Sequence, residues 1–181
     1  DLVTQHFPWV VLIYNDYNHG FARATNQAYR VSRGRYIMTL NPDTKLPPGS
    51  LKNIVDFFDN HPDAGAAQPW PTYTLFNRIY EPNFWKIIKD RLSLSLPESP
   101  PTSPRRVEWL WGTAITARRE VLLDKFYSEW SFLFCEEYDF CLLIRKAGYQ
   151  LYVLPFCIDH FLGGSRKNSF EIQRLTQHLA Q

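Results

Sequence analysis

The sequence has little cysteine, no long apolar run and almost no net charge. Its three cysteines, Cys135, Cys141 and Cys157, form no CxxC pair, which is typical of reduced intracellular thiols rather than of a disulfide framework. No apolar run approaches the roughly 20 residues that a membrane-spanning helix needs, and no charged-then-apolar signal peptide opens the chain. We therefore expect a cytoplasmic protein, with peripheral attachment at the inner face of the membrane left open.

The charge also argues against nucleic-acid binding. The net charge is +2, and the basic residues gather only in short pairs such as Arg105-Arg106 and Arg118-Arg119. A length of 181 residues fits a single domain, residues 1–181, with a substantial core. The aromatic content of 16%, with six tryptophans, suits a protein that binds sugars or rings and equally suits an aromatic core. Composition does not separate those two.

The first half of the chain alternates apolar runs with amphipathic stretches. Runs at 8–15, 36–40 and 64–69 predict buried strands. The stretches between them predict helices, one closing near Gly34 and one capped by Ser50. Strand–helix alternation predicts an α/β fold of βαβ units, with a mostly parallel sheet flanked by helices.

The second half is less regular. The Pro- and Ser-rich segment 91–106 predicts a mobile loop. Residues 107–117 and 149–155 predict further strands, and 136–148 predicts an amphipathic helix that ends at a glycine. The tail after Gly164 has a helical pattern.

Asp43 ends the buried run 36–40, in the sequence Asn41-Pro42-Asp43. Asn-Pro commonly starts a turn, so one interpretation makes Asp43 a turn residue. In open α/β sheets, however, ligands bind beyond the carboxyl ends of the strands. The proline ring also removes backbone freedom in front of the carboxylate. The second interpretation is that Asp43 holds a ligand or a metal.

Three acids, Glu136, Glu137 and Asp139, begin the predicted helix 136–148. Carboxylates in a first helical turn interact favourably with the helix dipole, which is a purely structural explanation. Four aromatic or apolar residues, 132–135, lead directly into the acids, which a surface helix start does not need. Glu136 and Asp139 share a helix face, and Glu137 points about 100° away. One acid binding a substrate hydroxyl and another acting as general base is the functional hypothesis.

His160 follows the predicted strand 149–155. A lone histidine at such a position is more often structural than a ligand. Beside Asp43 it would form a carboxylate–imidazole pair suited to Mn²⁺ or a similar ion. A zinc site built from Cys135, Cys141, Cys157 and His160 is the competing hypothesis, although their spacing fits no familiar zinc motif.

Three stretches carry a resemblance to a known family: NHGFARATNQAYRVSRGRYIMTLNPD, VEWLWGTAITARREV, and FLFCEEYDFCLLIRKAGYQLYVLP followed by DHFLGGS. They resemble the family 2 glycosyltransferases, in particular the rhamnosyltransferase-like branch that builds bacterial polysaccharides. The resemblance covers nearly the whole chain and implies a GT-A-like, Rossmann-like fold. Family members begin with two further strand–helix units, so the chain resembles an N-terminally truncated member.

The resemblance implies an inverting reaction on a UDP- or dTDP-sugar donor, a saccharide or lipid-linked acceptor, and Mn²⁺ or Mg²⁺. Asp43 corresponds to the metal-binding aspartate of a DxD-like motif, with Asn41 at its first acid, and His160 to an additional metal ligand. Glu137 stands in place of the usual aspartate base, and Glu136 would contact the acceptor. Positions near the donor or acceptor are Gly20, Phe21, Arg23, Asn26, Trp111 and Gly112.

The sequence therefore predicts an inverting, metal-dependent glycosyltransferase of polysaccharide biosynthesis, with one methylene more on its base than is usual. The alternative is a non-catalytic, truncated transferase-like module that binds a carbohydrate or a partner chain. An unpaired sheet edge would favour it, because such an edge invites association with another chain, a second copy included. A glycoside hydrolase also uses paired carboxylates but has no need of the Asn-Pro-Asp strand end.

Overall fold

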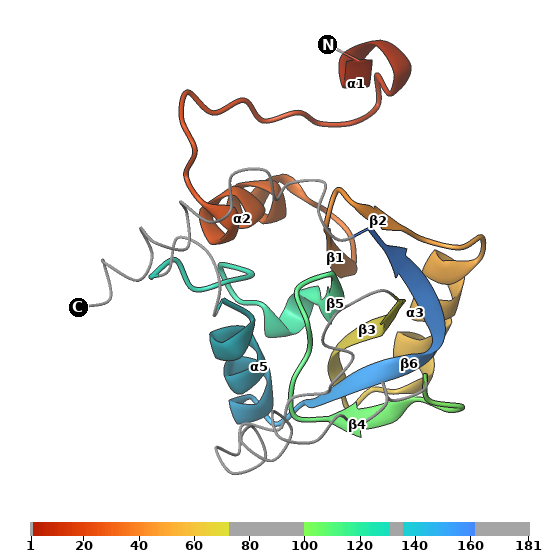
Figure 1. Ribbon diagram of the computed structural model, residues 1–181. Helices are drawn as coiled ribbons and strands as arrows, with labels where there is room; N and C mark the ends of the chain where they lie inside the picture. Colours follow the sequence, from red (N-terminus) through yellow and green to blue (C-terminus); the bar gives the residue numbers. More distant parts are fainter. Residues whose placement is uncertain (1, 73–99, 131–135, 162–181) are drawn as a thin grey trace, which may run out of the picture.

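A six-stranded mixed sheet forms the centre of the protein (Figure 1). The computed structural model describes residues 2–72, 100–130 and 136–161. Among these, the strand order is β1-β5-β3-β6-β2, with β4 pairing on β6. The strands are β1 (Tyr36–Leu40), β2 (Thr44–Lys45), β3 (Ala64–Thr72), β4 (Arg105–Val107), β5 (Ala114–Arg118) and β6 (Gln150–His160).

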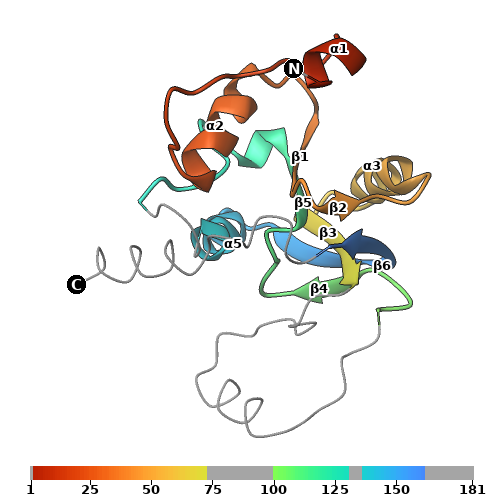
Figure 2. The same ribbon diagram turned by 45° about the horizontal axis from the view of Figure 1, so that its top comes forward.

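Helices cover both faces of this sheet. They are α1 (Leu2–His6), α2 (Phe21–Val31), α3 (Ser50–Asn60) and α5 (Glu136–Lys146), with a 3-10 turn at Arg119–Val121. Two views place α3 and α5 on opposite sides of the sheet (Figures 1 and 2). Alternate residues of β6 point to opposite faces. Leu151 and Val153 therefore pack in one apolar cluster with α5, whereas Tyr152 and Leu154 pack in another with α3.

The α/β class is confirmed, but the sheet is mixed rather than mostly parallel. Among the described strands, β3 and β6 pair parallel, and the other pairs are antiparallel. β1 and β3, joined through α3, run in the same direction as a βαβ unit requires. They are not neighbours, because β5 lies between them and pairs antiparallel with both. Local patterning could not show that a strand from much later in the chain inserts there.

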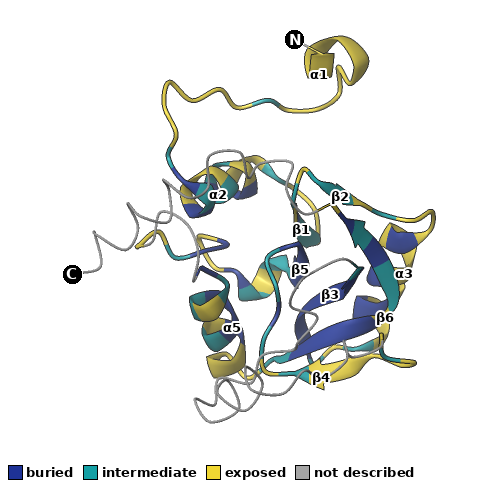
Figure 3. Ribbon diagram, in the orientation of Figure 1, coloured by how far each residue is buried: buried dark blue, intermediate teal, exposed yellow. Residues whose placement is uncertain are grey.

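The predicted strand at 8–15 is wrong for this structure. The segment runs along the outside of the body from α1 to α2, almost wholly exposed (Figures 1 and 3). Trp9 is 76% and Val11 72% exposed. A strand needs a neighbour to take up its backbone N–H and C=O groups, and none of the described strands pairs with this segment. The apolar pattern of this segment gives it a strand propensity, but no described strand is available for it to pair with.

Helix α3 starts at the predicted residue by a different mechanism. The Ser50 hydroxyl donates to the Pro47 carbonyl at 2.7 Å instead of capping the helix. Gly49 precedes the helix in a left-handed conformation, at φ 83°. At the other end, the Arg118 guanidinium donates to the carbonyls of Phe58 and His61. The helix is therefore fixed against the sheet at its C-terminal end by a charged side chain from β5.

Several predicted boundaries also shift. The strand expected at 107–117 is β4 and β5 with a loop between them, and the last strand runs on to include His160. Of the predicted loop 91–106, residues 91–99 lie outside the described part, and its last two residues begin β4. The helical tail expected after Gly164 also lies outside it. Within the described ranges, no helix has the length and apolar character to cross a membrane.

Candidate active site

Asp43 and His160 are brought together by the short antiparallel ladder between β2 and β6. Thr44 pairs with His160 in this ladder, and the Phe161 backbone N–H donates to the Asp43 carbonyl at 2.8 Å. His160 Nε2 consequently lies 3.2 Å from Asp43 Oδ1, with the two side chains only 9% and 17% exposed. The sequence predicted a metal role for His160 only if Asp43 lay beside it, and the structure places the two side chains together.

The Asp43–His160 pair fits a divalent cation in donor type and in spacing. Two ligands on adjacent vertices of an octahedron with bonds of about 2.1 Å lie about 3 Å apart. An imidazole nitrogen and a carboxylate oxygen are better ligands for Mn²⁺ or Mg²⁺ than a cysteine thiol is. No group of three His, Cys, Asp or Glu residues in the described part could hold a metal ion. The pair would supply two ligands and leave the other positions to water or to a bound diphosphate.

Cys141 does not support the competing zinc hypothesis. Its Sγ accepts a hydrogen bond from the Leu110 backbone N–H at 3.4 Å. Within the described residues, Cys141 belongs to no group of three or more His, Cys, Asp or Glu residues that could hold a metal ion. Cys135 lies outside the described residues.

Glu136 and Glu137 begin α5 with their carboxyl groups in different surroundings. Glu136 is only 3% exposed, and its Oε2 has no hydrogen-bond partner among the described residues. Burial raises the pKa of Glu136 to about 7, and the negative charge of Glu137 adds to that rise. A favourable contact with the helix dipole needs no such burial. A buried carboxyl pair with raised pKa values is instead typical of a functional site.

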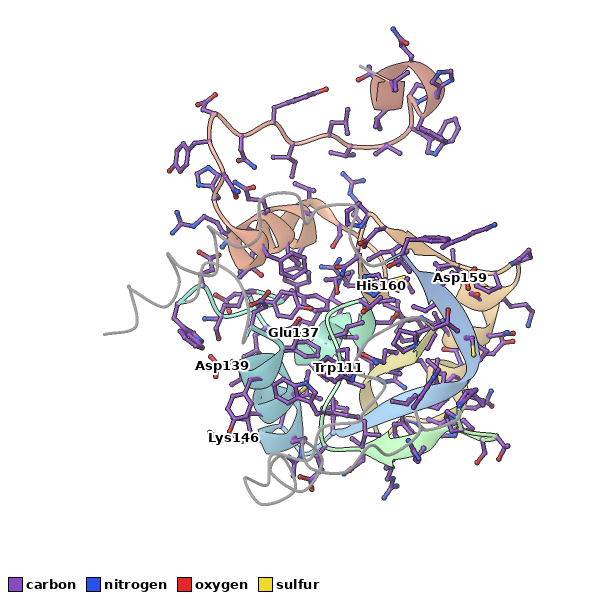
Figure 4. All side chains as sticks on the ribbon, in the orientation of Figure 1. Trp111, Glu137, Asp139, Lys146, Asp159 and His160 are labelled. Carbon is purple, nitrogen blue, oxygen red and sulfur yellow. The ribbon has the colours of Figure 1, made fainter. Side chains whose placement is uncertain are left out.

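Glu137 is half-buried against Gly112. Burial raises the pKa of Glu137, and hydrogen bonds from the backbone of Glu137 and of Gly112 oppose that rise. A Cβ atom built on Gly112 would lie 2.0 Å from Glu137 Oε1, so the carboxylate occupies the space that any other residue would fill. In Figure 4, Glu137 and Trp111 lie toward the centre of the molecule, between α5 and the sheet. Residues 111–112, which the sequence singled out, therefore pack against a candidate catalytic carboxylate.

The same backbone segment connects Glu137 with the Asp43 strand end. The Asn41 N–H donates to the Thr113 carbonyl at 3.0 Å, which ties the residue after β1 to the residue after Gly112. Asn41 also accepts from the Thr44 N–H at 3.1 Å through its backbone carbonyl. Residues 111–113 therefore contact Glu137 through Gly112 and are tied through Thr113 to Asn41, two residues before Asp43.

Asp139 lies apart from this arrangement. Its carboxylate accepts a hydrogen bond from the Trp130 indole at 2.6 Å, and it lies at the outer side of α5 in Figure 4. Glu136 and Asp139 thus have different neighbours, although they are three residues apart. A substrate contact for Asp139 stays a prediction.

Asn26 anchors α2 to the segment that follows the 3-10 turn. It is wholly buried, and its Oδ1 accepts from the N–H groups of Phe126 and Tyr127 at 2.8 and 3.0 Å. Its Nδ2 donates to the Tyr127 carbonyl and to Glu129 Oε1, both at 2.8 Å. All these bonds lie within the protein, so the structure gives Asn26 a definite positioning role for α2. Its contact with a donor stays a prediction.

The other predicted donor residues lie at the start of the same helix. Gly20 precedes α2 at φ 83°, a left-handed region that favours glycine. The Phe21 ring packs 5.6 Å from the Tyr127 ring, and Arg23 Nε pairs with Glu129 at 3.3 Å. These contacts show how the NHGFARATN motif positions α2, and its role toward a donor is untested.

Sequence reasoning missed Tyr127, which joins α2, β1 and α5. Its hydroxyl lies 3.3 Å from Thr39 Oγ1, and its ring packs on Phe140 of α5. Burial strongly raises the pKa of the Tyr127 hydroxyl, with Glu137 and Glu136 adding to the rise. No local signal marks this residue, because its importance comes from three distant segments.

The sequence profile of the family described as "Glycosyl transferase family 2" matches residues 2–169. The chain belongs to glycosyltransferase family 2. This confirms the family resemblance of the three sequence stretches, while the rhamnosyltransferase-like branch and the truncation stay predictions.

The matched stretch of this family 2 chain spans only a small part of the length of its curated relatives. "Minor teichoic acid biosynthesis protein GgaB" of Bacillus subtilis (strain 168) is 33% identical over 57 residues, 32% of this chain and 6% of that protein. "Uncharacterized protein y4gI" of Sinorhizobium fredii (strain NBRC 101917 / NGR234) is 37% identical over 57 residues, with the same coverage of 32% and 6%.

A solved structure shows the fold. "Mannosyltransferase PcManGT from Pyrobaculum calidifontis in complex with GDP-Man and Mn2+" superposes with a TM-score of 0.61 at 18% identity. The match covers 98% of this chain and 47% of that one, so the chain spans about half of its structural relative. The GT-A-like α/β fold is thereby confirmed for this family 2 glycosyltransferase chain.

Proposed function

We propose that this chain carries the catalytic part of an inverting, metal-dependent glycosyltransferase. The donor is a nucleotide sugar and the acceptor is a saccharide or lipid-linked saccharide in polysaccharide biosynthesis. Its structural relative was solved with GDP-Man and Mn2+, which supports a nucleotide-sugar donor and a divalent cation here. The sequence resemblance favours a UDP- or dTDP-sugar as the donor, whereas the structural relative favours a GDP-sugar.

One observation carries the proposal: residues 111–113 link two chemically distinct acidic centres. Thr113 ties the segment to Asn41 beside Asp43 and His160. Gly112 holds it against the Glu137 carboxylate. Glycosyl transfer needs one group that neutralises the departing diphosphate and a separate group that takes the acceptor proton. The Asp43–His160 pair, at the ends of adjacent strands, would meet the first need. The Glu137 carboxylate, at the start of one helix, would meet the second.

The Asp43 carboxylate and His160 Nε2 would hold the divalent cation. When bound, such a cation neutralises the diphosphate as it leaves and so assists the reaction without proton transfer. The ladder between β2 and β6 supports this role, because it brings the two side chains to this spacing.

Glu137 would accept the proton of the acceptor hydroxyl as that oxygen attacks the anomeric carbon. A general base works best with a pKa near the operating pH, and burial raises the pKa of Glu137 toward that range. Burial and the negative charge of Glu137 raise the pKa of Glu136 to about 7, so Glu136 could carry a proton near neutral pH. Glu136 can then donate a hydrogen bond to an acceptor oxygen.

A thermal-shift series tests the donor site directly. UDP, dTDP and GDP are each added with and without Mn²⁺ to the unmodified chain, Asp43→Ala and Asp159→Ala. A ligand that binds only the native state raises the melting temperature by mass action. We expect a shift that needs both one nucleotide and Mn²⁺ and that is lost in Asp43→Ala. Asp159→Ala is the matched control, since Asp159 pairs with Lys45 one position along the same ladder.

The series also decides between the two functions. A metal-dependent shift for one nucleotide names the donor class. No shift with any nucleotide would contradict the proposal and favour the non-catalytic binding module.

A further inference from the structure

Gln68 is a buried amide in a strand made mostly of apolar residues. It lies on β3 within AGAAQPW and is 2% exposed. Strand β3 is covered on both faces, and burying an amide there costs free energy unless it is hydrogen-bonded. Its Oε1 accepts from the Trp111 backbone N–H at 2.6 Å, which is at the short end for such a bond.

The position of this bond is informative. Trp111 directly precedes Gly112, and Gly112 is the residue against which the Glu137 carboxylate packs. Residues 111 and 112 belong to the loop between β4 and β5, so no ladder hydrogen bonds fix them there. The backbone that faces Glu137 is instead held on one side by Gln68 and on the other by Asn41, which donates to the Thr113 carbonyl.

We propose that Gln68 is a positioning residue for the transfer reaction, fixing the Trp111–Gly112 backbone and through it the Glu137 carboxylate. This inference rests on the proposed function, since it assigns Glu137 the role of base. A carboxylate misplaced by about 1 Å can lose on the order of 100-fold in rate. An acceptor buried in β3 and connected to Glu137 through Trp111 and Gly112 is thus able to influence the reaction without touching the reactants.

Gln68→Met removes the acceptor and keeps the length of the side chain, and Gln68→Glu keeps an acceptor oxygen. The matched control is Thr116→Val on β5: Thr116 is equally buried, pairs with Ala67 beside Gln68, and its Oγ1 has no partner in the described part. If Gln68→Met fails to fold, Gln68→Asn replaces it, because the shorter amide withdraws the acceptor from Trp111.

Two readouts are measured on the full chain by NMR, without any substrate. Amide exchange reports the Trp111 N–H, and a ¹³C-carboxyl titration, assigned with Glu137→Gln, reports the pKa of Glu137. In Gln68→Met we expect Trp111 protection to fall about fivefold or more, because the amide loses its hydrogen-bond acceptor. The pKa of Glu137 should change, because a loosened segment alters both the burial of the carboxylate and its hydrogen bond from the Gly112 backbone.

Gln68→Glu should retain the Trp111 protection, and Thr116→Val should leave both readouts unchanged. Loss of Trp111 protection with an unaltered Glu137 pKa would reduce Gln68 to a core hydrogen bond and overturn the proposal. An unaltered Trp111 amide would overturn it as well. Neither result depends on nucleotide binding, so this inference and the proposed function fail separately.

Discussion

Replacing Gly112 by alanine tests the contact at the centre of the candidate site. The added Cβ would lie 2.0 Å from Glu137 Oε1 and 3.0 Å from its Cδ. Ordinary carbon–oxygen contacts lie near 3.5 Å, so the carboxylate has to move by more than about 1 Å. Gly112 is not among the glycines with positive φ, so alanine fits its backbone and the strain falls on Glu137.

The cost should appear in the rate rather than in the stability. Glu137 is half-buried and can rotate away, so the free energy of unfolding should fall by only about 1 kcal/mol, at the low end for overpacking. A displacement of this size should lower kcat about 100-fold, while the donor KM, which depends on the Asp43 side, should change little. The assay is the initial rate of sugar transfer with the donor identified by thermal shift.

Gly148→Ala is the matched control at the opposite end of α5. Nothing lies within 4 Å of a Cβ there, but the backbone has φ +88°, so alanine should cost about 1 kcal/mol through strain alone. We expect both variants to lose a similar, small amount of stability, and only Gly112→Ala to lose kcat. A Gly112→Ala variant whose kcat stays within about threefold of the original would refute the assignment of Glu137 as base.

Three further predictions concern burial. Glu136→Gln should raise the melting temperature at pH 8 and lose that advantage near pH 4.5: the folded-state pKa of about 7 means that ionising Glu136 costs stability as pH rises between those values. An equal effect at both pH values would contradict this. Asn26→Ala should lower the free energy of unfolding in urea by about 3 kcal/mol or more, because buried backbone groups of residues 126 and 127 lose their partners. Arg23→Ala, at an exposed ion pair, should cost less than about 1 kcal/mol, and equal losses would argue against the Asn26 account. The exposed segment 8–15 should make the chain self-associate in sedimentation velocity, and Val11→Lys should weaken this; a concentration-independent monomer would be the opposite result.

The regular elements with strong local signals were predicted well. The strand at 36–40 and the starts of α3 and α5 were placed correctly, because period, turn residues and helix boundaries are properties of neighbouring residues. The segment 8–15 has an equally strong strand pattern and forms no strand, because a strand requires a partner that periodicity does not describe. The order of β5 between β1 and β3 depends on contacts between distant segments and was missed for the same reason.

The candidate site divides in a similar way. Motif resemblance identified Asp43, His160, Glu137 and Gly112 as residues of interest, since the types and order of these residues are written in the chain. The sequence did not reveal Gln68 or Tyr127, although a single amide within AGAAQPW was a signal that something polar had to be satisfied there.

The sequence by itself determined the α/β class, the family and the chemical types at the candidate site. Only the tertiary structure decided that Asp43 lies 3.2 Å from His160, that Glu137 fills the space left by Gly112, and that Glu136 is buried. Distances, desolvation and pKa shifts arise when segments far apart in the chain pack together, and no single segment contains them.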